Sequence, residues 1–478
     1  MKRLLIYITL FCSALLASCS EEADFSAIPQ YRLEFSSDTV SFDTLFTSVG
    51  SPTAAFVVRN RNGKSLRVNS VELASGGNSG FSVLVDGQYG SLMTGLEVRA
   101  KDSIFVLASV RLANNGVPEP VAVRDTLLFN LESGLQQHVI LEAFGMDAEF
   151  MRGAVLENDT VLPSGRYVIY DSLKVSQGAT LALEPGTTLY FHDKAFMRVE
   201  GTLQACGTLE NPIVFRGDRT DGMFSYLPYD RIPGQWDGVA FASTSSNNVL
   251  RHCDIHSANY GIKVEQGCFD EERLMLESSK VHNFHGNALE LVMARATVVN
   301  SLLANSQGNC VKVVGGNVRF VHCTIANFYV WRLRDVALAL HNSLDGEPAP
   351  LHDAVFANCV VAGTKDDEVM GYMMPADSAG CAFNYRFENS LVNTPDTGDT
   401  CFVNVVYDRP ENENFGKLNF CTIDNDIFYY DFRLSAMSAA RGISSGAYAG
   451  VAPLDLDGNQ RPSDAADAGC FQYTEQEE

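Results

Sequence analysis

Hydrophobic residues from Gly165 onward occur in short runs, each ending at a glycine or proline after about six to ten residues. One run covers residues 189–191 and another covers residues 213–215, with the turn Pro185-Gly186 ahead of them. Runs this short cannot pair as long hairpins, but each can pair with the next coil of a solenoid. The pattern therefore predicts short parallel strands between Gly165 and Trp236.

An internal repeat continues past that point, with a serine or cysteine followed two places later by a branched aliphatic residue. The repeat steps are 26, 22, 22, 36, 31 and 31 residues. Steps near 22 suit one coil of three short strands, and longer steps require loop insertions. We expect the aliphatic residues to stack as an interior column. The small residues are Cys253, Ser279, Ser301, Cys323, Cys359, Ser390 and Cys421, and the aliphatic ones are Ile255, Val281, Leu303, Ile325, Val361, Val392 and Ile423.

Two polar columns accompany this repeat. Asparagine recurs four places after the small residue, where a turn with left-handed backbone would suit it. On a second alternating segment, Lys263, Glu290 and Lys312 should point outward and neighbour one another on adjacent coils. The repeated asparagines are Asn283, Asn305, Asn327 and Asn425.

Two passages resemble bacterial right-handed β-helix proteins of the pectin-lyase-like family. Residues 234–241 resemble the opening coils, and residues 457–462 with 469–473 resemble the terminal coil, although Gln472 stands where relatives usually have an acid. The resemblance implies a right-handed parallel β-helix over residues 154–473. It is specific for fold and not for activity.

Residues 31–148 show alternating short strands separated by polar or glycine-containing turns such as Asp86-Gly87. Such strands predict a small antiparallel β-sandwich, and residues 57–60 resemble immunoglobulin-like modules. The whole chain is therefore expected to be all-β, with the sandwich ahead of the β-helix as a spacer or packing platform.

The N-terminus carries an export signal. Lys2 and Arg3 precede an apolar stretch over residues 4–16, which is too short for a comfortable membrane span. Leu16-Ala17-Ser18-Cys19 closely resembles a bacterial lipobox, which implies a signal peptide over residues 1–19 and lipidation of Cys19. The alternative is an ordinary signal peptide with a chance cysteine.

Ser20-Glu21-Glu22 then resembles the surface-export signal of Bacteroidetes lipoproteins, and residues 20–30 read as a linker. The expected location is the outer membrane, lipid-anchored and exposed at the cell surface. The periplasmic face of that membrane is the alternative.

A net charge of −23 argues against nucleic acid as a partner and against tight binding of acidic polysaccharides without a local basic groove. Ten cysteines lie in the β-helix region, and those of the serine-and-cysteine column are expected to be buried free thiols. Because no Cys-x-x-Cys pair occurs, no metal site and no cofactor are predicted.

The strongest candidate site is a histidine group. His256 and His282 share a repeat position and should stack on adjacent coils, beside the pair Asp254 and Lys280, while His285 lies three residues further on. These histidines form either a sugar or metal patch or, as we favour, polar turn residues in a solvated column. The adjacent acids Asp366 and Asp367 lie in an inserted polar loop. His285-Gly286 and Ile262-Lys263 resemble pieces of the polygalacturonase pattern, but they precede these acids, whereas in that family the acids come first.

The sequence therefore favours a membrane-anchored, non-catalytic binding or structural protein, adhesin-like, that meets a glycan or another surface protein. The alternative is a carbohydrate-active enzyme, a polysaccharide lyase or a glycoside hydrolase. Its site would lie among the inserted loops at residues 219–235, 342–354 or 364–380. A groove with converging carboxylates, or with a carboxylate beside Lys, Arg or His, would favour the enzyme.

Overall fold

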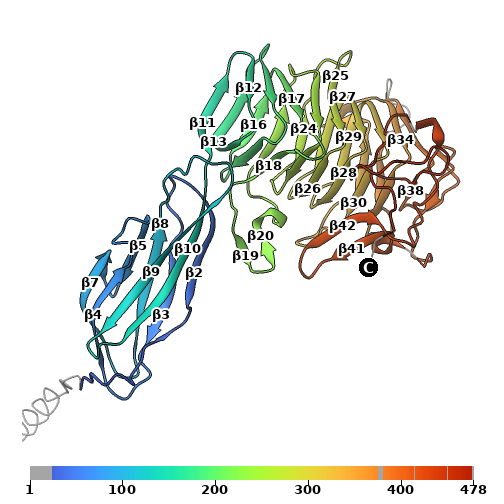
Figure 1. The fold of residues 1–478 in the computed structure, drawn as a ribbon. Coiled ribbons are helices and arrows are strands. Elements are labelled where there is room, and N and C mark those ends of the chain that lie inside the picture. The colour runs from blue at the N-terminus through green and yellow to red at the C-terminus, as the bar shows by residue number, and fades with distance from the viewer. Residues whose placement is uncertain (1–23, 375–380, 414, 449, 476–478) are drawn as a thin grey trace, which may run out of the picture. The chain divides into compact units, whose positions relative to one another are not determined.

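The computed structural model describes residues 24–374, 381–413, 415–448 and 450–475. The chain forms two compact units, Met1–Asp147 and Ala148–Glu478 (Figure 1). The signal peptide and Cys19 lie outside the described residues, so lipidation stays a prediction. In the part of the chain that is described, no helix has the length and apolar character needed to span a membrane.

The first unit is a sandwich of two five-stranded sheets, as the alternating pattern predicts. In β5, Phe81, Val83 and Val85 point into the core while the residues between them are partly exposed. One sheet has the order β1-β3-β8-β5-β6 and the other β2-β10-β9-β4-β7; in the second, β2 and β10 pair in parallel. The strands are β1 (Glu34–Phe35), β2 (Thr39–Phe46), β3 (Ala54–Arg59), β4 (Leu66–Leu73), β5 (Phe81–Val85), β6 (Gln88–Gly90), β7 (Leu92–Val98), β8 (Ser103–Val110), β9 (Val121–Leu131) and β10 (Gln136–Met146).

The second unit is a right-handed parallel β-helix built on a sheet of 26 strands. Its strands stack in three columns, here called the first, second and third faces. The first face holds β11 (Glu149–Leu156), β13 (Arg166–Val175), β15 (Thr188–Phe191), β18 (Ile213–Gly217), β23 (Cys253–His256), β26 (Lys280–Phe284), β28 (Leu302–Ser306), β30 (Thr324–Asn327), β35 (Val360–Gly363), β38 (Leu391–Val392) and β40 (Val406–Tyr407).

The other two faces complete each coil. The second face holds β16 (Phe196–Val199), β21 (Gly238–Phe241), β24 (Ile262–Val264), β27 (Leu289–Val299), β29 (Val311–Val321), β31 (Leu338–His341) and β36 (Val369–Tyr372). The third face holds β12 (Thr160–Leu162), β14 (Thr180–Leu183), β17 (Thr202–Cys206), β22 (Asn248–Arg251), β25 (Glu272–Glu277), β34 (Leu351–Ala357), β37 (Phe383–Glu388) and β39 (Phe402–Val403). The long strands β11, β13, β27 and β29 bend from one face into a neighbouring one.

The predicted aliphatic column is confirmed on the first face. Val281 pairs in register with Leu303, which pairs with Ile325, and all three are fully buried in one core. Aromatic side chains form a second interior column on the third face. Phe320, Phe356, Phe387 and Phe402 stack with ring centroids 4.9, 4.8 and 4.8 Å apart, close to the inter-strand spacing of roughly 4.8 Å. Parallel winding therefore converts a sequence repeat into continuous packing.

The prediction for Cys421 and the terminal coil was wrong. Val392 pairs with Tyr407 rather than with Ile423, so the column ends in β40. Residues 420–424 instead form β41 (Phe420–Asp424), which pairs antiparallel with β42 (Tyr429–Leu434). The alternation of hydrophobic and polar residues in this hairpin is the same as in a β-helix coil, because such a pattern predicts a strand but does not specify which strand it pairs with.

The predicted asparagine column was also only partly right. Asn283 and Asn305 have left-handed backbone, but Asn327 does not. The continuous left-handed column lies one residue before the small-residue column, with φ between 46° and 53° throughout. Its members are His252, Ser278, Asn300, His322, Asn358, Asn389 and Asn404. Asparagine suits this position because it tolerates left-handed backbone.

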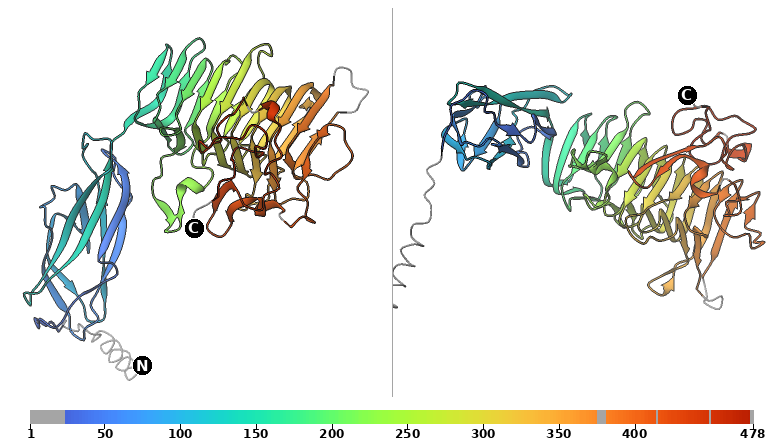
Figure 2. Two further views of the ribbon diagram at one scale, coloured as in Figure 1. Left: turned by 45° about the vertical axis from the view of Figure 1, so that its right-hand side comes forward. Right: turned by 90° about the horizontal axis from the view of Figure 1, so that it is seen from below.

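The C-terminal segment folds back over the outside of the first face (Figure 2). Outward residues of the coils, such as Leu302 and Val360, pack against Phe432, Leu456 and Phe471 in a separate core. The remaining small elements are the hairpins β19–β20 (Gly222–Phe224, Leu227–Pro228) and β32–β33 (Ser343–Leu344, Glu347–Pro348), and the 3-10 helices η1 (Tyr229–Arg231), η2 (Gly416–Asn419) and η3 (Gly446–Tyr448).

The charged column on the second face is confirmed. Lys263 pairs in register with Glu290, and Glu290 pairs with Lys312. The Lys312 Nζ lies 3.1 Å from the Glu290 carboxylate. The cysteines described, from Cys206 to Cys470, form no disulfide, and Cys253, Cys323 and Cys359 are buried as predicted. Cys421 is only partly buried, because it lies in β41 and not in a coil. Burial raises the pKa of the Cys323 and Cys253 thiols, so both are neutral and unreactive.

Candidate functional site

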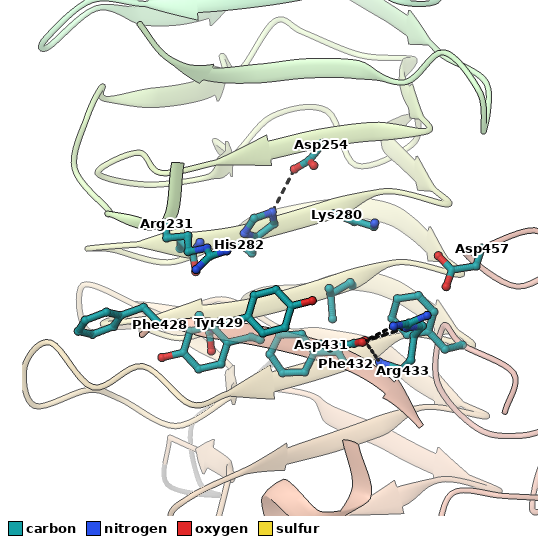
Figure 3. A pocket seen from close by; sticks show the side chains of 15 residues that line it. Arg231, Asp254, Lys280, His282, Phe428, Tyr429, Asp431, Phe432, Arg433 and Asp457 are labelled. Carbon is teal, nitrogen blue, oxygen red and sulfur yellow. Dashed lines mark hydrogen bonds and ion pairs between the residues drawn. The ribbon is translucent and has the colours of Figure 1, made fainter. Parts of the chain in front are cut away.

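A cleft of 430 Å³ lies between the first face of the β-helix and the C-terminal segment (Figure 3). Small-molecule sites typically measure ~300–1,000 Å³. One wall comes from β23, β26 and β28, and the other from β42 with Asp457 and Phe471. The cleft therefore exists only because the chain returns to its own coils after the parallel winding has ended.

The coil wall presents the predicted polar column. Asp254 and Lys280 are register partners on adjacent coils, as are His256 and His282. The two imidazole rings stack with centroids 5.1 Å apart. Parallel pairing places equivalent residues side by side. These four polar side chains, at most 28 residues apart in sequence, therefore lie in one small patch.

Asp254 bridges the two histidines. Its Oδ1 lies 3.0 Å from Nδ1 of His256 and 3.1 Å from Nε2 of His282, as the ring pointing toward Asp254 in Figure 3 illustrates for His282. Burial opposes charge here, yet the two imidazoles hold the pKa of Asp254 well below its usual range. Burial likewise opposes a charged His256, but the carboxylates of Asp254 and Asp230 raise its pKa to about 9. The cluster is a bridged carboxylate rather than three independent turn residues.

The inserted loop at residues 219–235 completes the site. Asp230 Oδ1 lies 3.6 Å from Nε2 of His256 and 2.5 Å from Arg216. The Ser257 hydroxyl donates to the Asp230 carbonyl, which ties the loop to the coil. Trp236, fully buried, ends the loop by donating its Nε1–H to the His256 carbonyl at 2.9 Å.

The loop at residues 219–235 also contacts the β41–β42 hairpin, which forms the other wall of the cleft. Arg231 donates to the Ile427 carbonyl at 3.3 Å and lies over the Tyr429 ring, 5.1 Å from its centroid. Figures 1 and 2 accordingly show β19–β20 and β41–β42 on the same side of the β-helix. Phe428 stacks on Trp331 with centroids 4.1 Å apart, which anchors the tip of the hairpin.

Charged groups on the hairpin side also converge. Arg433 pairs with Asp431 at 2.9 Å, and the positive charge of Lys280 acts against a raised pKa at both Asp431 and Asp457. Burial favours the neutral form of Asp431, but its hydrogen bonds to Arg433 outweigh burial, so the pKa of Asp431 is lowered. For Asp457, burial and the neighbouring carboxylates outweigh the nearby positive charges, so the pKa of Asp457 is raised. Two carboxylates with opposite shifts thus face one cleft.

The candidate residues from the sequence separate into two groups. His256 and His282 come together as expected, whereas His285 bonds Asn259 Oδ1 at 3.3 Å and does not line the cleft. Asp366 and Asp367 do not line it either; Asp367 accepts from the Val369 N–H at 3.0 Å. Sequence reasoning missed Asp230 and Asp431, although it identified the loop at residues 219–235 as an insertion.

Neither a family model nor a curated protein matches this chain. A Yersinia enterocolitica family 28 exopolygalacturonase shares 8% identity over 74% of this chain and 89% of its own, with a TM-score of 0.28. The catalytic domain of a GH87 α-1,3-glucanase shares 9% over 73% and 86%, with a TM-score of 0.17. A Porphyromonas gingivalis W83 protein of unknown function shares 16% over 26% of this chain and 48% of its own, with a TM-score of 0.19. At such scores these likenesses carry no functional argument, and this chain spans about half of the last protein.

Proposed function

We propose that this chain is a lipid-anchored cell-surface protein whose β-helix binds a neutral saccharide in the cleft. The observation that carries the proposal is the composition of the cleft. It combines an exposed aromatic ring, several hydrogen-bonding side chains and balanced charge in one concave site.

Tyr429 supplies the aromatic surface. Its residue surface is 42% exposed, and Arg231 lies against its ring and fixes its orientation. The faces of a pyranose ring expose C–H groups that pack on an aromatic ring, while its hydroxyl groups need donors and acceptors. Lys280, Asn283 and Asn305 supply both kinds of group from three neighbouring positions on the coils.

Charge balance argues for a neutral ligand. Asp254, Asp431 and Asp457 offset Arg231, Lys280 and Arg433, so the lining residues form no basic groove. The chain as a whole carries a net charge of −23, which opposes a polyanion. A hydroxyl-rich, uncharged oligosaccharide fits these conditions.

The membrane address rests on the lipobox at residues 16–19 and the Ser20-Glu21-Glu22 segment. Cys19→Ser should abolish incorporation of labelled fatty acid and release the protein from the membrane fraction. Protease digestion of intact cells then separates the surface from the periplasmic face. Retention of label by the C19S variant would contradict lipidation at this cysteine.

The binding test uses a glycan array with the full chain in mild detergent. We expect a neutral oligosaccharide to bind, and Tyr429→Ala to weaken binding about tenfold or more, since buried aromatic contacts dominate binding energy. The matched control is Tyr226→Ala, because Tyr226 is 50% exposed but lies on the β19–β20 side outside the cleft lining. Equal affinity of the Y429A and wild-type chains would overturn the placement of the site.

A second candidate function, cleavage of the saccharide, is favoured by Asp457, a carboxyl group that lines the cleft and whose pKa is raised by burial. A carboxyl group with a raised pKa suits the general-acid role of glycoside hydrolysis. Any array ligand should therefore be incubated with the chain and analysed for products. Turnover that Asp457→Asn abolishes without weakening binding would assign catalysis, and binding without products would leave a binding protein.

A further inference from the structure

We propose that Asp254, His256 and His282 bind a divalent transition-metal ion, with Zn²⁺ as the best fit. The site goes beyond the proposed function, because it does not depend on saccharide binding. It also departs from the sequence-based expectation of no metal, which considered cysteine spacing. The coils assemble this donor set from positions that no local motif links.

The donor atoms have the geometry of a coordination shell. Asp254, His256 and His282 each offer one donor atom within 4.8 Å of the others. Asp254 Oδ1 lies 3.0 Å from His256 Nδ1 and 3.1 Å from His282 Nε2. Donors placed about 2.0–2.1 Å from a zinc ion are separated by roughly 2.8–3.0 Å in octahedral and roughly 3.3–3.4 Å in tetrahedral geometry, so these two distances fall between those values. Two imidazoles and one carboxylate suit zinc and its first-row neighbours, and do not suit the oxygen-rich shells of Ca²⁺ or Mg²⁺.

The far side of His256 already holds the support that a ligand histidine requires. Its side chain is only 8% exposed, and its Nε2 lies 3.6 Å from Asp230 Oδ1, just beyond a hydrogen bond, so that buried nitrogen is unsatisfied. A metal on Nδ1 would fix the proton on Nε2 and aim it at Asp230. Arg216 in turn holds Asp230 at 2.5 Å. This carboxylate–histidine arrangement typically orients metal ligands and raises their basicity.

The fourth position would open into the cleft. Asp254 and His282 both line the cleft, whereas His256 does not. Three protein ligands with one open position characterise zinc sites that bind water or a substrate oxygen. The single charge on Asp254 leaves a bound divalent ion with a net positive charge, which would favour an oxygen ligand from the cleft.

The experiment measures metal binding by the full chain, purified in detergent without a histidine tag and treated with chelator. Isothermal titration with ZnCl₂ should give one site. His282→Ala and Asp254→Ala should each weaken binding at least about 100-fold, since even supporting residues typically contribute 10–100-fold. Asp230→Asn should weaken it about 10–100-fold while leaving the stoichiometry at one.

Two controls make the result specific. His285→Ala removes a histidine next to the cluster that lies outside the donor set, and should bind Zn²⁺ as the wild type does. Substitution with Co²⁺ should give a visible d–d spectrum that the H282A variant loses, and circular dichroism verifies that each variant is folded. Wild-type affinity no tighter than that of H282A, or a d–d spectrum that survives this variant, would overturn the proposal.

Discussion

Two polar clusters on the same β-helix differ in how their charges are satisfied. Arg334 and Glu368 form a closed pair, with side chains 5% and 0% exposed. Besides Arg334, Glu368 accepts the backbone N–H groups of Ala337 and Lys365, each at 2.9 Å. The Asp254 cluster, in contrast, leaves His282 24% exposed at a cleft. A carboxylate whose oxygens are filled by its own chain can only stabilise the fold, whereas one that faces open space can bind something else.

The largest expected effect comes from breaking the closed pair. Glu368→Ala leaves the Arg334 guanidinium buried without its partner, and removing one member of a buried pair typically costs ~3–5 kcal/mol. Urea denaturation of wild type and variant measures the difference. The control is Glu290→Ala, because Glu290 is a partly exposed residue of the second face. If E368A and E290A lose the same free energy of unfolding, burial of the Arg334–Glu368 pair does not contribute as proposed.

A pH effect of similar size is expected from His322, a buried member of the left-handed column. Burial, with help from Arg461, lowers its pKa to about 3. The unfolded chain takes up a proton near pH 6.5, so stability that is present at neutral pH is lost as pH falls from about 6.5 to 3. The loss amounts to up to ~5 kcal/mol.

Asp408 acts in the opposite sense, since burial raises its pKa to about 6 and its protonation favours the folded state below that pH. The test therefore compares wild type with His322→Asn, because asparagine occupies the same left-handed column at Asn300 and Asn358. Denaturation at pH 7 and pH 4 should show a smaller acid loss in the variant. An identical pH dependence in both would contradict the role of His322.

The smallest effect is expected from the partly exposed pair of Glu290 and Lys312. Glu290 and Lys312 have side chains 20% and 30% exposed, and such pairs contribute about 0–1 kcal/mol. Glu290→Ala should change the free energy of unfolding within that range, and added salt should reduce the difference. A loss above about 2 kcal/mol would contradict the account, because a partly exposed pair would then stabilise the fold nearly as much as the buried pair of Arg334 and Glu368.

The fold was predictable wherever the sequence repeats. Val281, Leu303 and Ile325 were placed correctly because burial on one side of a period-two strand leaves a regular signal. The prediction failed at Cys421, where a two-stranded hairpin shows the same local alternation. What distinguishes β41 from a coil is its antiparallel partner β42, and pairing is a long-range property.

Only the part of the candidate site that lies on the repeated coils was predictable from the sequence. The stacking of His256 on His282 follows from the repeat. Asp230 reaches His256 from an insertion, and Asp431 reaches the cleft from beyond the last coil, so no spacing rule links either to its neighbours. Residues brought together by an inserted loop and a returning segment become visible only in the folded chain.

Hydrogen–deuterium exchange is the most direct test of the proposal that the cleft binds the ligand. The full chain would be measured with and without the oligosaccharide selected on the array. Protection should concentrate in residues 254–256 and 280–284 and in β42, on both walls of the cleft. Protection confined to the second or third face, with β42 unchanged, would contradict the account.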